Sequence, residues 1–499
     1  MHAQTQPLER YKTHIDGEWV ESASGEYFES DNPYTGQPWA LIPKCNAEDV
    51  DRAVQAAHRA FTTGDWSKLT ATQRGALLRK LADRLAEHAE HLAAIEVRDN
   101  GKLIAEMGAQ LKYLPQWYYY YGGLADKIEG AVIPIDKPGN FNYTRYEPLG
   151  VVGAIIPWNS PLLLTAWKLA PALAAGNTVV IKPSEYTAAS TLEFIKVLEE
   201  VGFPRGVVNV VTGFGPDVGT PLVEHPLVRK IAFTGSDKTG QLIYETAARG
   251  LKRVSLELGG KSPNIVFDDA HMENAIKGAI AGIFAATGQT CIAGSRLLVQ
   301  ESFHDEFVEK LVAFAKTAKM GDPMSVDTQV GPVTNKPQYK KVLDYIDIAK
   351  GEGVETALGG AKATRPECGD GWFVEPTIFT GVNNSMRIAQ EEVFGPVLSV
   401  IPFKDEDHAL EVGNDIVFGL AAGVWTQSIR RAITMAERLQ AGTVWVNTYR
   451  AVSYMSPFGG YKRSGLGREN GQEMIKEHMQ IKSVWINTAT EVPDPFVIR

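Results

Sequence analysis

The pattern of apolar and polar positions divides the chain into a helical N-terminal region and a region of alternating strands and helices. Asn46 is suited to cap a helix with apolar residues at helical spacing, and Thr70 with Gln73 forms a capping box before a longer helix that ends near Gly101. After Gly150, short apolar β-branched runs alternate with helical stretches, at 151–156, 179–181, 207–211, 230–233 and 254–258. This alternation predicts a parallel sheet, which binds ligands beyond the carboxyl ends of its strands.

A second alternating region follows residue 291. Strands are expected at 297–299, 397–401 and 443–446, which indicates another α/β lobe. Two further strand-like runs, 140–147 and 479–487, stand apart from both regions. We expect them to be edge strands that pair with another subunit.

Length and composition narrow the class of protein. A chain of 499 residues is too long for one simple core. The net charge is −9 and the Lys and Arg residues are scattered along the chain, so no nucleic-acid partner is expected. Apolar runs such as 169–181 and 275–286 are broken well short of the roughly 20 residues that a membrane span needs. The N-terminal residues lack an apolar signal core, and three cysteines favour a reducing compartment. We therefore expect a cytoplasmic protein without a metal site.

Cys291 is the first candidate for chemistry. It lies in GQTCIAG, where Gly288 and Gly294 leave room for a substrate to approach the sulfur. The alternative is a buried and inert cysteine, which is the better interpretation for Cys45 and Cys368.

Two polar residues stand at the ends of predicted strands. Glu257, in LELGGKSPN, is followed by Gly259 and Gly260, so its carboxylate has room to act as a general base. Asn159, in PWN, offers an amide donor for an oxyanion. The alternatives are a surface or helix-capping glutamate and an asparagine turn.

Glycine-rich segments suggest where a cofactor binds. Gly213, Gly215 and Gly219 have the spacing GxGxxxG, a near miss to the dinucleotide fingerprint. The segment FTGS ends a strand and opens a helix, so Gly235 and Ser236 are better placed to offer backbone N–H groups to a diphosphate.

Lys182 and Glu185, in KPSE, follow another strand and could reach ribose hydroxyls. Each alone is more often a solvated charge. Together, the segments at these strand ends indicate one site.

The order of PWN, KPSE, FTGS, LELGGKSPN, GQTC, EEVFGPV and WVN followed by SPFGGYKRSG resembles the aldehyde dehydrogenase superfamily, from about Tyr11 to Trp485. The resemblance lies closest to the NAD-dependent, non-acylating enzymes that hydrolyse their thioester. It implies an α/β fold with a Rossmann-like NAD-binding domain (1–124 and 149–259), an α/β catalytic domain (260–467) and a small β oligomerisation domain (125–148 and 468–499). It also implies self-association to a dimer or a homotetramer.

The resemblance implies a role for each matching residue. Cys291 is the nucleophile, Glu257 the base, and Asn159 with the Cys291 backbone N–H the oxyanion hole; Lys168 and Glu469 are polar positions near the site, with Glu469 a second base or proton relay. The implied cofactor contacts are Ile155, Pro157, Trp158, Lys182, Glu185, Gly215, Gly219, Phe233, Gly235, Ser236, Leu258, Gln338, Glu392 and Phe394. The implied aldehyde tunnel is lined by Ser160, Trp167, Thr290, Ile292, Arg450 and Phe458.

These residues predict oxidation of an aldehyde to its acid through a Cys291 thiohemiacetal and thioester, which water activated by Glu257 hydrolyses. NAD should be preferred to NADP because the Glu185 carboxylate would repel a 2′-phosphate, although Lys182 softens the preference. The rival interpretations are a CoA-acylating relative, which tends to lack the glutamate, a cysteine hydrolase, which needs a histidine partner, and a non-enzymatic binding protein.

The substrate is left open by the sequence. Ser160 is smaller than the aromatic residue of many acetaldehyde-type relatives, which favours a wider tunnel. The run WYYYY at 117–121 either walls the tunnel or packs as an ordinary helix. Arg450 either binds a distal carboxylate of the substrate or is a solvated arginine.

Overall fold

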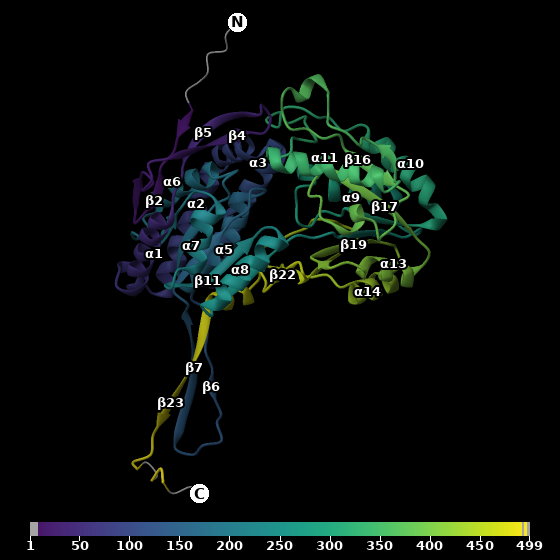
Figure 1. The fold of residues 1–499 in the computed structure, drawn as a ribbon. Helices are drawn as coiled ribbons and strands as arrows, with labels where there is room; N and C mark the ends of the chain where they lie inside the picture. Colours follow the sequence, from purple (N-terminus) through teal and green to yellow (C-terminus); the bar gives the residue numbers. More distant parts are fainter. Residues whose placement is uncertain (1–7, 492–493, 497–499) are drawn as a thin grey trace.

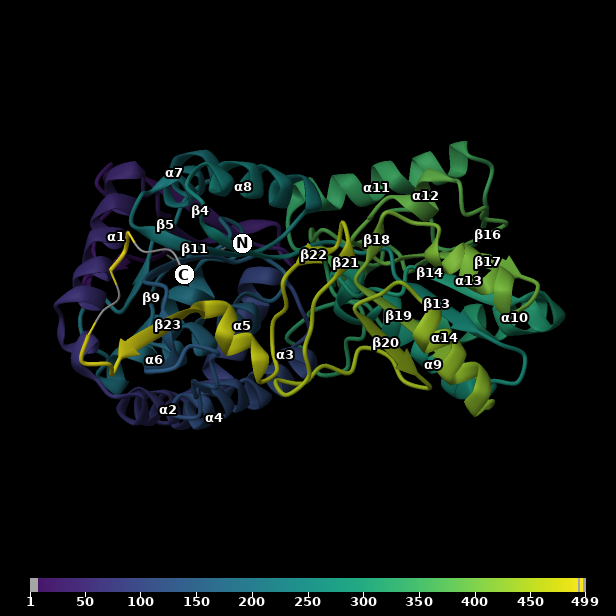
Figure 2. The same cartoon turned by 90° about the horizontal axis from the view of Figure 1, so that it is seen from below.

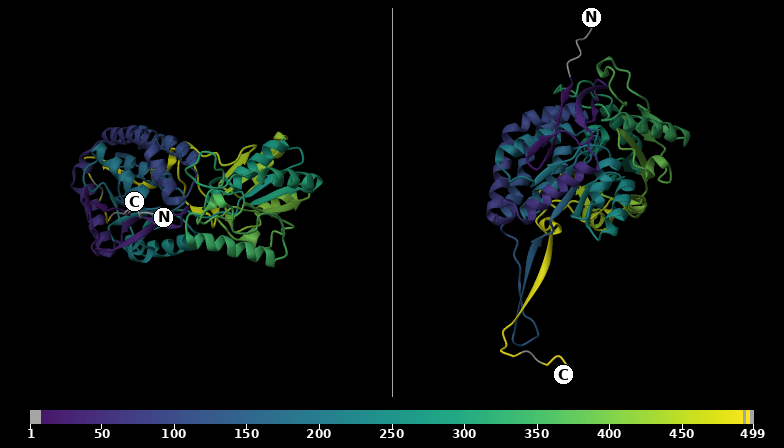
Figure 3. Two further views of the ribbon diagram at one scale, coloured as in Figure 1. Left: turned by 90° about the horizontal axis from the view of Figure 1, so that it is seen from above. Right: turned by 60° about the vertical axis from the view of Figure 1, so that its left-hand side comes forward.

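The computed structural model describes residues 8–491 and 494–496; the outermost residues of the predicted ranges 1–124 and 468–499 lie outside this part. Two α/β lobes stand side by side, and a narrow β arm projects from the first of them (Figure 1). Figure 3 shows the same arrangement from above and from the side, with the arm extending away from both lobes. The predicted α/β class with parallel sheets is confirmed.

The first lobe is built on an eight-stranded sheet. All five predicted strands form and pair in parallel in the order β12-β11-β8-β9-β10, with bounds β8 Val151–Ile155, β9 Thr178–Lys182, β10 Val208–Val210, β11 Val228–Thr234 and β12 Arg253–Glu257. Three antiparallel strands extend its edges, β2 Thr13–Ile15 and β3 Glu18–Val20 beyond β10, and β22 Gly465–Leu466 beyond β12. Strand β22 therefore returns a distant segment to the edge next to Glu257.

Helices cover both faces of this sheet (Figure 2). One face packs against α1 Ala47–Thr62, α7 Thr220–Glu224 and α8 Asp237–Arg249, and the other against α2 Ala71–Asn100, α5 Pro161–Ala175 and α6 Ala189–Val201. Next to α2 lie α3 Ile104–Tyr113 and α4 Pro115–Leu124. The predicted caps at Asn46 and Thr70 form, and α2 ends at Gly101 in a left-handed conformation. A small sheet of β1 Glu9–Arg10, β4 Tyr27–Asn32 and β5 Gln37–Pro43 completes the lobe.

The second lobe contains a seven-stranded sheet in the order β15-β16-β17-β14-β13-β19-β20. Its strands are β13 Pro263–Val266, β14 Arg296–Gln300, β15 Glu355–Leu358, β16 Thr377–Thr380, β17 Val397–Phe403, β19 Ala421–Trp425 and β20 Thr443–Val446. Its helices are α9 Met272–Ile283, α10 His304–Ala315, α11 Lys336–Gly351, α12 Arg387–Gln390, α13 Glu406–Asn414 and α14 Ile429–Arg438. A short pair, β18 Phe418–Gly419 and β21 Tyr461–Lys462, lies at its border.

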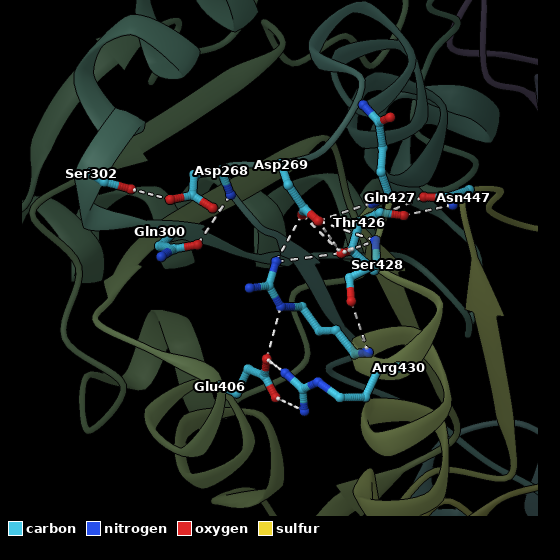
Figure 4. Close-up of polar contacts among 11 residues, drawn as sticks. Asp268, Asp269, Gln300, Ser302, Glu406, Thr426, Gln427, Ser428, Arg430 and Asn447 are labelled. Carbon is cyan, nitrogen blue, oxygen red and sulfur yellow. Dashed lines mark hydrogen bonds and ion pairs between the residues drawn. The ribbon is translucent and has the colours of Figure 1, made fainter.

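A polar cluster at the end of β13 joins two elements of this lobe (Figure 4). The Asp269 carboxylate accepts hydrogen bonds from the backbone N–H groups of Gln427 and Ser428, at 3.2 and 3.1 Å. It also pairs with Arg431 of α14 at 2.8 Å, while Glu406 pairs with the same arginine from α13. The half-buried carboxylate of Asp269 thus holds the start of α14 close to the end of β13.

The arm is a three-stranded sheet of β6 Val132–Ile133, β7 Asn140–Pro148 and β23 Met479–Asn487. The prediction that both long strands are edge strands is confirmed for β23 and wrong for β7, and pairing with another subunit stays a prediction. The two strands pair with each other along their whole length within one chain, which places β7 in the centre and leaves β23 with an open edge. None of the helices in the described part of the chain has the length and hydropathy needed to cross a lipid bilayer.

Candidate active site

Two adjoining pockets follow the carboxyl ends of the parallel strands in the first lobe. One has a volume of about 440 Å³ and the other about 130 Å³, and both are bordered by Pro157, Trp158 and Ser236. Every residue predicted as a cofactor contact lines at least one of them. The larger pocket holds Ile155, Lys182, Glu185, Gly215, Gly219, Phe233 and Gly235, and the smaller holds Leu258, Gln338, Glu392 and Phe394.

The larger pocket combines a polar end, a helix N-terminus and apolar walls. Lys182 Nζ lies 3.2 Å from the Glu185 carboxylate, and burial lowers the pKa of the lysine while Glu185 acts in the opposite direction. Ser236 caps α8 by accepting a hydrogen bond from Thr239 N at 3.3 Å, so the helix N-terminus faces the pocket. A Cβ at Gly235 would lie 2.4 Å from the Phe233 ring, so a larger residue there would displace that ring. This arrangement suits a diphosphate flanked by a nucleoside.

The smaller pocket is shaped by the segment that carries Glu392 and Phe394. Phe394 has a left-handed backbone (φ 60°), and Gln338 Nε2 holds the turn by donating to the carbonyls of Val393 and Phe394 at 2.8 and 2.9 Å. The Phe394 ring meets Trp158 edge to face at 5.2 Å. Glu392 accepts a hydrogen bond from Gly260 N at 3.0 Å.

Cys291 lies between the short turn Ala285–Gly288 (η3) and strand β14, and its side chain borders the smaller pocket. Burial raises the pKa of this thiol to about 12, and the carboxylates of Glu257 and Glu392 add to the effect. The thiol is therefore neutral at physiological pH, so it needs a base or a nearby positive charge to become a nucleophile.

Asn159 follows β8 and borders the same pocket as Cys291. Its amide nitrogen donates one hydrogen to Gln289 O at 3.0 Å. Because the amide carries two hydrogens, this bond fixes the group while the second hydrogen remains for a ligand.

Glu257 is the last residue of β12 and is almost fully buried. Neither of its carboxylate oxygens has a hydrogen-bond partner in the described part of the chain. Burial, followed by the charge of Glu469, raises its pKa well above the ordinary value. The side chain thus has the proton affinity of a general base in a dry site.

The charge of Lys168, on α5, acts on Glu257 and lowers its pKa, against the effect of burial. Lys168 Nζ donates to Glu469 at 2.6 Å and to Thr234 Oγ1 at 2.7 Å. Thr234 lies opposite Glu257 in the sheet register. The strand β22 and the bridge between Phe458 and Glu469 bring this distant segment to the site.

Several predicted tunnel residues belong to one apolar cluster that Cys291 borders. Trp167 meets Phe458 edge to face at 5.1 Å, and Ile292 is buried in the same cluster. Trp117 stacks on Trp167 at 6.2 Å. In the aromatic run at 117–121, Trp117, Tyr118 and Tyr121 are buried, which supports ordinary helix packing, and a role in walling the tunnel stays a prediction.

Two further residues predicted to line the tunnel make contacts that the sequence did not suggest. Ser160 Oγ lies 2.5 Å from the buried Lys102 Nζ, a residue missed because a lysine after a helix end is usually solvated. Arg450 is partly exposed, with Nη1 donating to Ala281 O at 3.2 Å. Thr290, next to Cys291, is half-buried, and its hydroxyl has no partner among the described residues.

The other two cysteines are buried, and burial raises the pKa of each to about 11, as expected for inert thiols. Over residues 8–491 and 494–496, no group of three or more His, Cys, Asp or Glu side chains is arranged to hold a metal ion.

Residues 19–484 match the model of the aldehyde dehydrogenase family. The chain is 46% identical to a (Z)-2-((N-methylformamido)methylene)-5-hydroxybutyrolactone dehydrogenase of Acinetobacter baylyi, over 99% of this chain and 100% of that one. It is 45% identical to human retinal dehydrogenase 2, covering 95% and 91% of the two chains. The structure of Staphylococcus aureus betaine aldehyde dehydrogenase in complex with NAD+ superposes with a TM-score of 0.96, at 42% identity and with 97% and 96% coverage. The chain belongs to the aldehyde dehydrogenase family.

Proposed function

We propose that the protein oxidises an aldehyde to the carboxylic acid with NAD, through a thioester on Cys291 that water hydrolyses. The observation that carries the proposal is the placement of Cys291, Asn159 and Glu392 around one pocket that adjoins a second pocket fitted to a dinucleotide. The NAD+ complex of the Staphylococcus aureus relative supports the choice of cofactor.

The residues of both pockets fit NAD. Lys182 and Glu185 would hold the adenosine ribose, Gly235 and Ser236 at the start of α8 the diphosphate, and Glu392 with Phe394 the nicotinamide ribose. When bound, NAD supplies the hydride acceptor for the oxidation. We propose that the first lobe is the NAD-binding domain, the second the catalytic domain and the arm the oligomerisation domain.

In the first half of the reaction, the Cys291 thiol must lose its proton before the sulfur attacks the aldehyde carbon. Burial disfavours that loss, and a positive charge next to the sulfur would favour it. The free amide hydrogen of Asn159 and the Cys291 backbone N–H then hold the carbonyl oxygen as it gains negative charge. Loss of hydride from the carbon leaves the thioester.

In the second half, Glu257 removes a proton from the water that attacks the thioester, and the acid leaves. Lys168 and Glu469 act as relay residues that take the proton onward, because their ion pair lies directly beside Glu257. The sulfur takes the second proton of the water and leaves as the thiol, so the product is the carboxylate and Cys291 is ready for the next aldehyde.

The aromatic lining of Trp167 and Phe458 fits an apolar aldehyde, and Ser160 leaves space where many relatives carry a ring. A carboxylate-bearing aldehyde would need the remaining donors of Arg450. Rates across aliphatic, aromatic and carboxylated aldehydes separate these substrate classes.

We also propose that the protein forms a dimer or tetramer through the arm and works in the cytoplasm. The apolar side chains exposed on the arm support the first part. The three free cysteines, which fit a reducing compartment, support the second.

The proposal is tested by mixing the protein with NAD and a panel of aldehydes while following the absorbance of the reduced cofactor, with and without CoA. We expect turnover without CoA, and Cys291→Ala should abolish it because no covalent step remains. Cys45→Ala and Cys368→Ala serve as controls and should keep activity near that of the unsubstituted protein. Turnover that needs CoA would indicate an acylating enzyme, and turnover by Cys291→Ala would remove the assigned nucleophile.

A further inference from the structure

A row of buried polar side chains continues from Glu257 along the sheet, away from the pockets. Strands β11 and β12 are in parallel register, with Thr234 opposite Glu257 and Lys230 opposite Arg253. Because alternate residues of a strand share a face, Glu257, Ser255 and Arg253 lie on one face, and Thr234 and Lys230 lie on the same one. Lys168 of α5 bonds to Thr234, so this is the face that α5 covers.

The middle of the row consists of polar groups that have no hydrogen-bond partner among the described residues. Lys230 and His478 are completely buried, and Ser255 nearly so. Within the described residues, Lys230 Nζ, both ring nitrogens of His478 and Ser255 Oγ have no hydrogen-bond partner. His478 ends the short helix Glu473–His478 (η6), which packs against α5 (Figure 2).

The far end of the row reaches solvent. Glu477 is exposed, and a Cβ built on Gly467 would lie 3.5 Å from Ser255 Cβ and 4.0 Å from a Glu477 carboxylate oxygen. Gly467 thus lies between Ser255 of the row and the Glu477 carboxylate, and it has no side chain to separate them. Arg253, also exposed, marks the same end by donating to Met479 O at 2.5 Å.

We propose that Lys230, His478 and Ser255, with Glu477 at the mouth, carry protons between Glu257 and solvent along this face of the sheet. The inference rests on the proposed function and extends it beyond Lys168 and Glu469. Each turnover converts an aldehyde, NAD+ and one water into a carboxylate, NADH and two protons. The proton of the Cys291 thiol and one proton of the water must therefore leave a buried site, while the second proton of the water restores the thiol.

The surroundings of Lys230 suit proton exchange. Burial lowers its pKa to about 8; Glu477 and Glu469 oppose this effect, and Arg253 and Lys168 reinforce it. The lysine can therefore gain and lose a proton near neutral pH.

His478 suits transfer in another way. Burial, together with the charges of Lys230 and Lys168, lowers its pKa well below the ordinary value. A neutral imidazole has one donor and one acceptor nitrogen, so it can pass a proton across its ring.

A purely structural role explains the row poorly. A buried and unpaired lysine disfavours folding, and an apolar residue of similar size would pack at lower cost. Lys230→Met should therefore fold at least as well as the unsubstituted protein, which makes it a usable probe.

The test compares Lys230→Met and Glu477→Gln with Glu473→Gln, a matched control whose carboxylate pairs with Lys476 on the same short helix. Rapid mixing with NAD and a good aldehyde reports the first burst of NADH, and the steady phase reports hydrolysis. We expect both test variants to keep the burst, and Lys230→Met to lose about a hundredfold in steady turnover, the low end for a positioned proton-transfer group. The apparent pKa of about 8 should also disappear from its pH profile of turnover. Glu473→Gln should behave as the unsubstituted protein.

Unchanged turnover and pH profile in both test variants would overturn the inference, as would equal losses in Glu477→Gln and Glu473→Gln or a lost burst in Lys230→Met. Thermal unfolding checks that Lys230→Met is folded, and the exposed Glu477→Gln provides the test if it is not. Absence of NADH formation by the unsubstituted protein with every aldehyde would instead refute the proposed function.

Discussion

At the scale of single residues, burial is the main cause of the raised pKa of both Cys291 and Glu257. Burial raises the pKa of the thiol to about 12 and that of the carboxyl well above its ordinary value, so both groups favour the protonated form in the free protein. Each negative charge also disfavours the other. A positive charge brought next to Cys291 would favour the thiolate, which is consistent with a nucleophile that becomes reactive only when the cofactor site is filled.

Substitution of Glu257 by Gln should separate the two halves of the reaction. Glutamine keeps the shape but cannot accept the proton of water, so we expect a burst of about one NADH per active site followed by slow turnover. Mass spectrometry of the stalled enzyme should find an acyl group on Cys291. Absence of both the burst and the adduct would move the base to another residue, with Glu469 the first to examine.

Glu185 should set the preference for NAD over NADP. Its carboxylate lies in the larger pocket beside Lys182, where it would repel a 2′-phosphate. We expect Glu185→Gln to lower the NAD-to-NADP ratio of kcat/KM by about tenfold, which corresponds to roughly 1.4 kcal/mol. Glu199→Gln, an exposed carboxylate remote from that pocket, is the control. An unchanged ratio would show that the preference has another origin.

The residues predicted from the sequence share a property that those missed do not. Asn159, Glu257 and Ser236 follow strands, where the topology alone brings side chains to one edge. Lys102 and Lys230 gain their significance from burial by elements distant in sequence. Local pattern carries no sign of such burial, and a lone lysine is by default a solvated charge.

At the scale of elements, the long amphipathic helices and the β-branched strands were predictable because each buries a face that its own periodicity displays. The short edge strands β2, β3 and β22 were not predicted. They have two or three residues each; β2 and β22 pair with strands far away in the chain, and β3 pairs only with β2. The central position of β7 was missed because a strand pattern does not show which other strands pair with it.

Asp269 provides a test at this scale. Replacing it with Ala removes the acceptor for the backbone N–H groups of Gln427 and Ser428 and the partner of Arg431. We expect a loss of about 1–3 kcal/mol in the free energy of unfolding and faster amide hydrogen exchange at the start of α14. The neighbouring Asp268→Ala is the matched control, because that exposed carboxylate accepts one bond, from Ser302 Oγ at 3.0 Å (Figure 4). Equal exchange rates in both variants would show that Asp269 does not hold the helix.

At the scale of the whole molecule, the two lobes meet at the proposed site, and each lobe contributes residues to it. The first lobe contributes Asn159 and Glu257, and the second contributes Cys291 and Glu392. Neither lobe alone contains the proposed site. Relative motion of the lobes would therefore change the distance between nucleophile and base.

The arm is a thin sheet that has little core of its own. Val132, Ile481, Trp485 and Ile486 are exposed on it, with 67, 58, 55 and 45% of their surface accessible. Apolar groups gathered on a projecting sheet are typical of an interaction surface, and we expect another copy of the chain to cover this one. We expect Trp485→Asp to lower the mass measured by light scattering after size exclusion, because a carboxylate in a buried interface is costly.

Phe314→Asp is the control for this prediction, since Phe314 is a comparably exposed aromatic residue on α10, far from the arm (Figure 1). It should leave the mass unchanged. A monomeric mass for the unsubstituted protein, or equal masses for all three proteins, would show that the arm is not the interface. A fall in mass with Trp485→Asp alone, together with an intact NADH burst at low protein concentration, would show that each subunit holds a complete site and that the arm serves assembly.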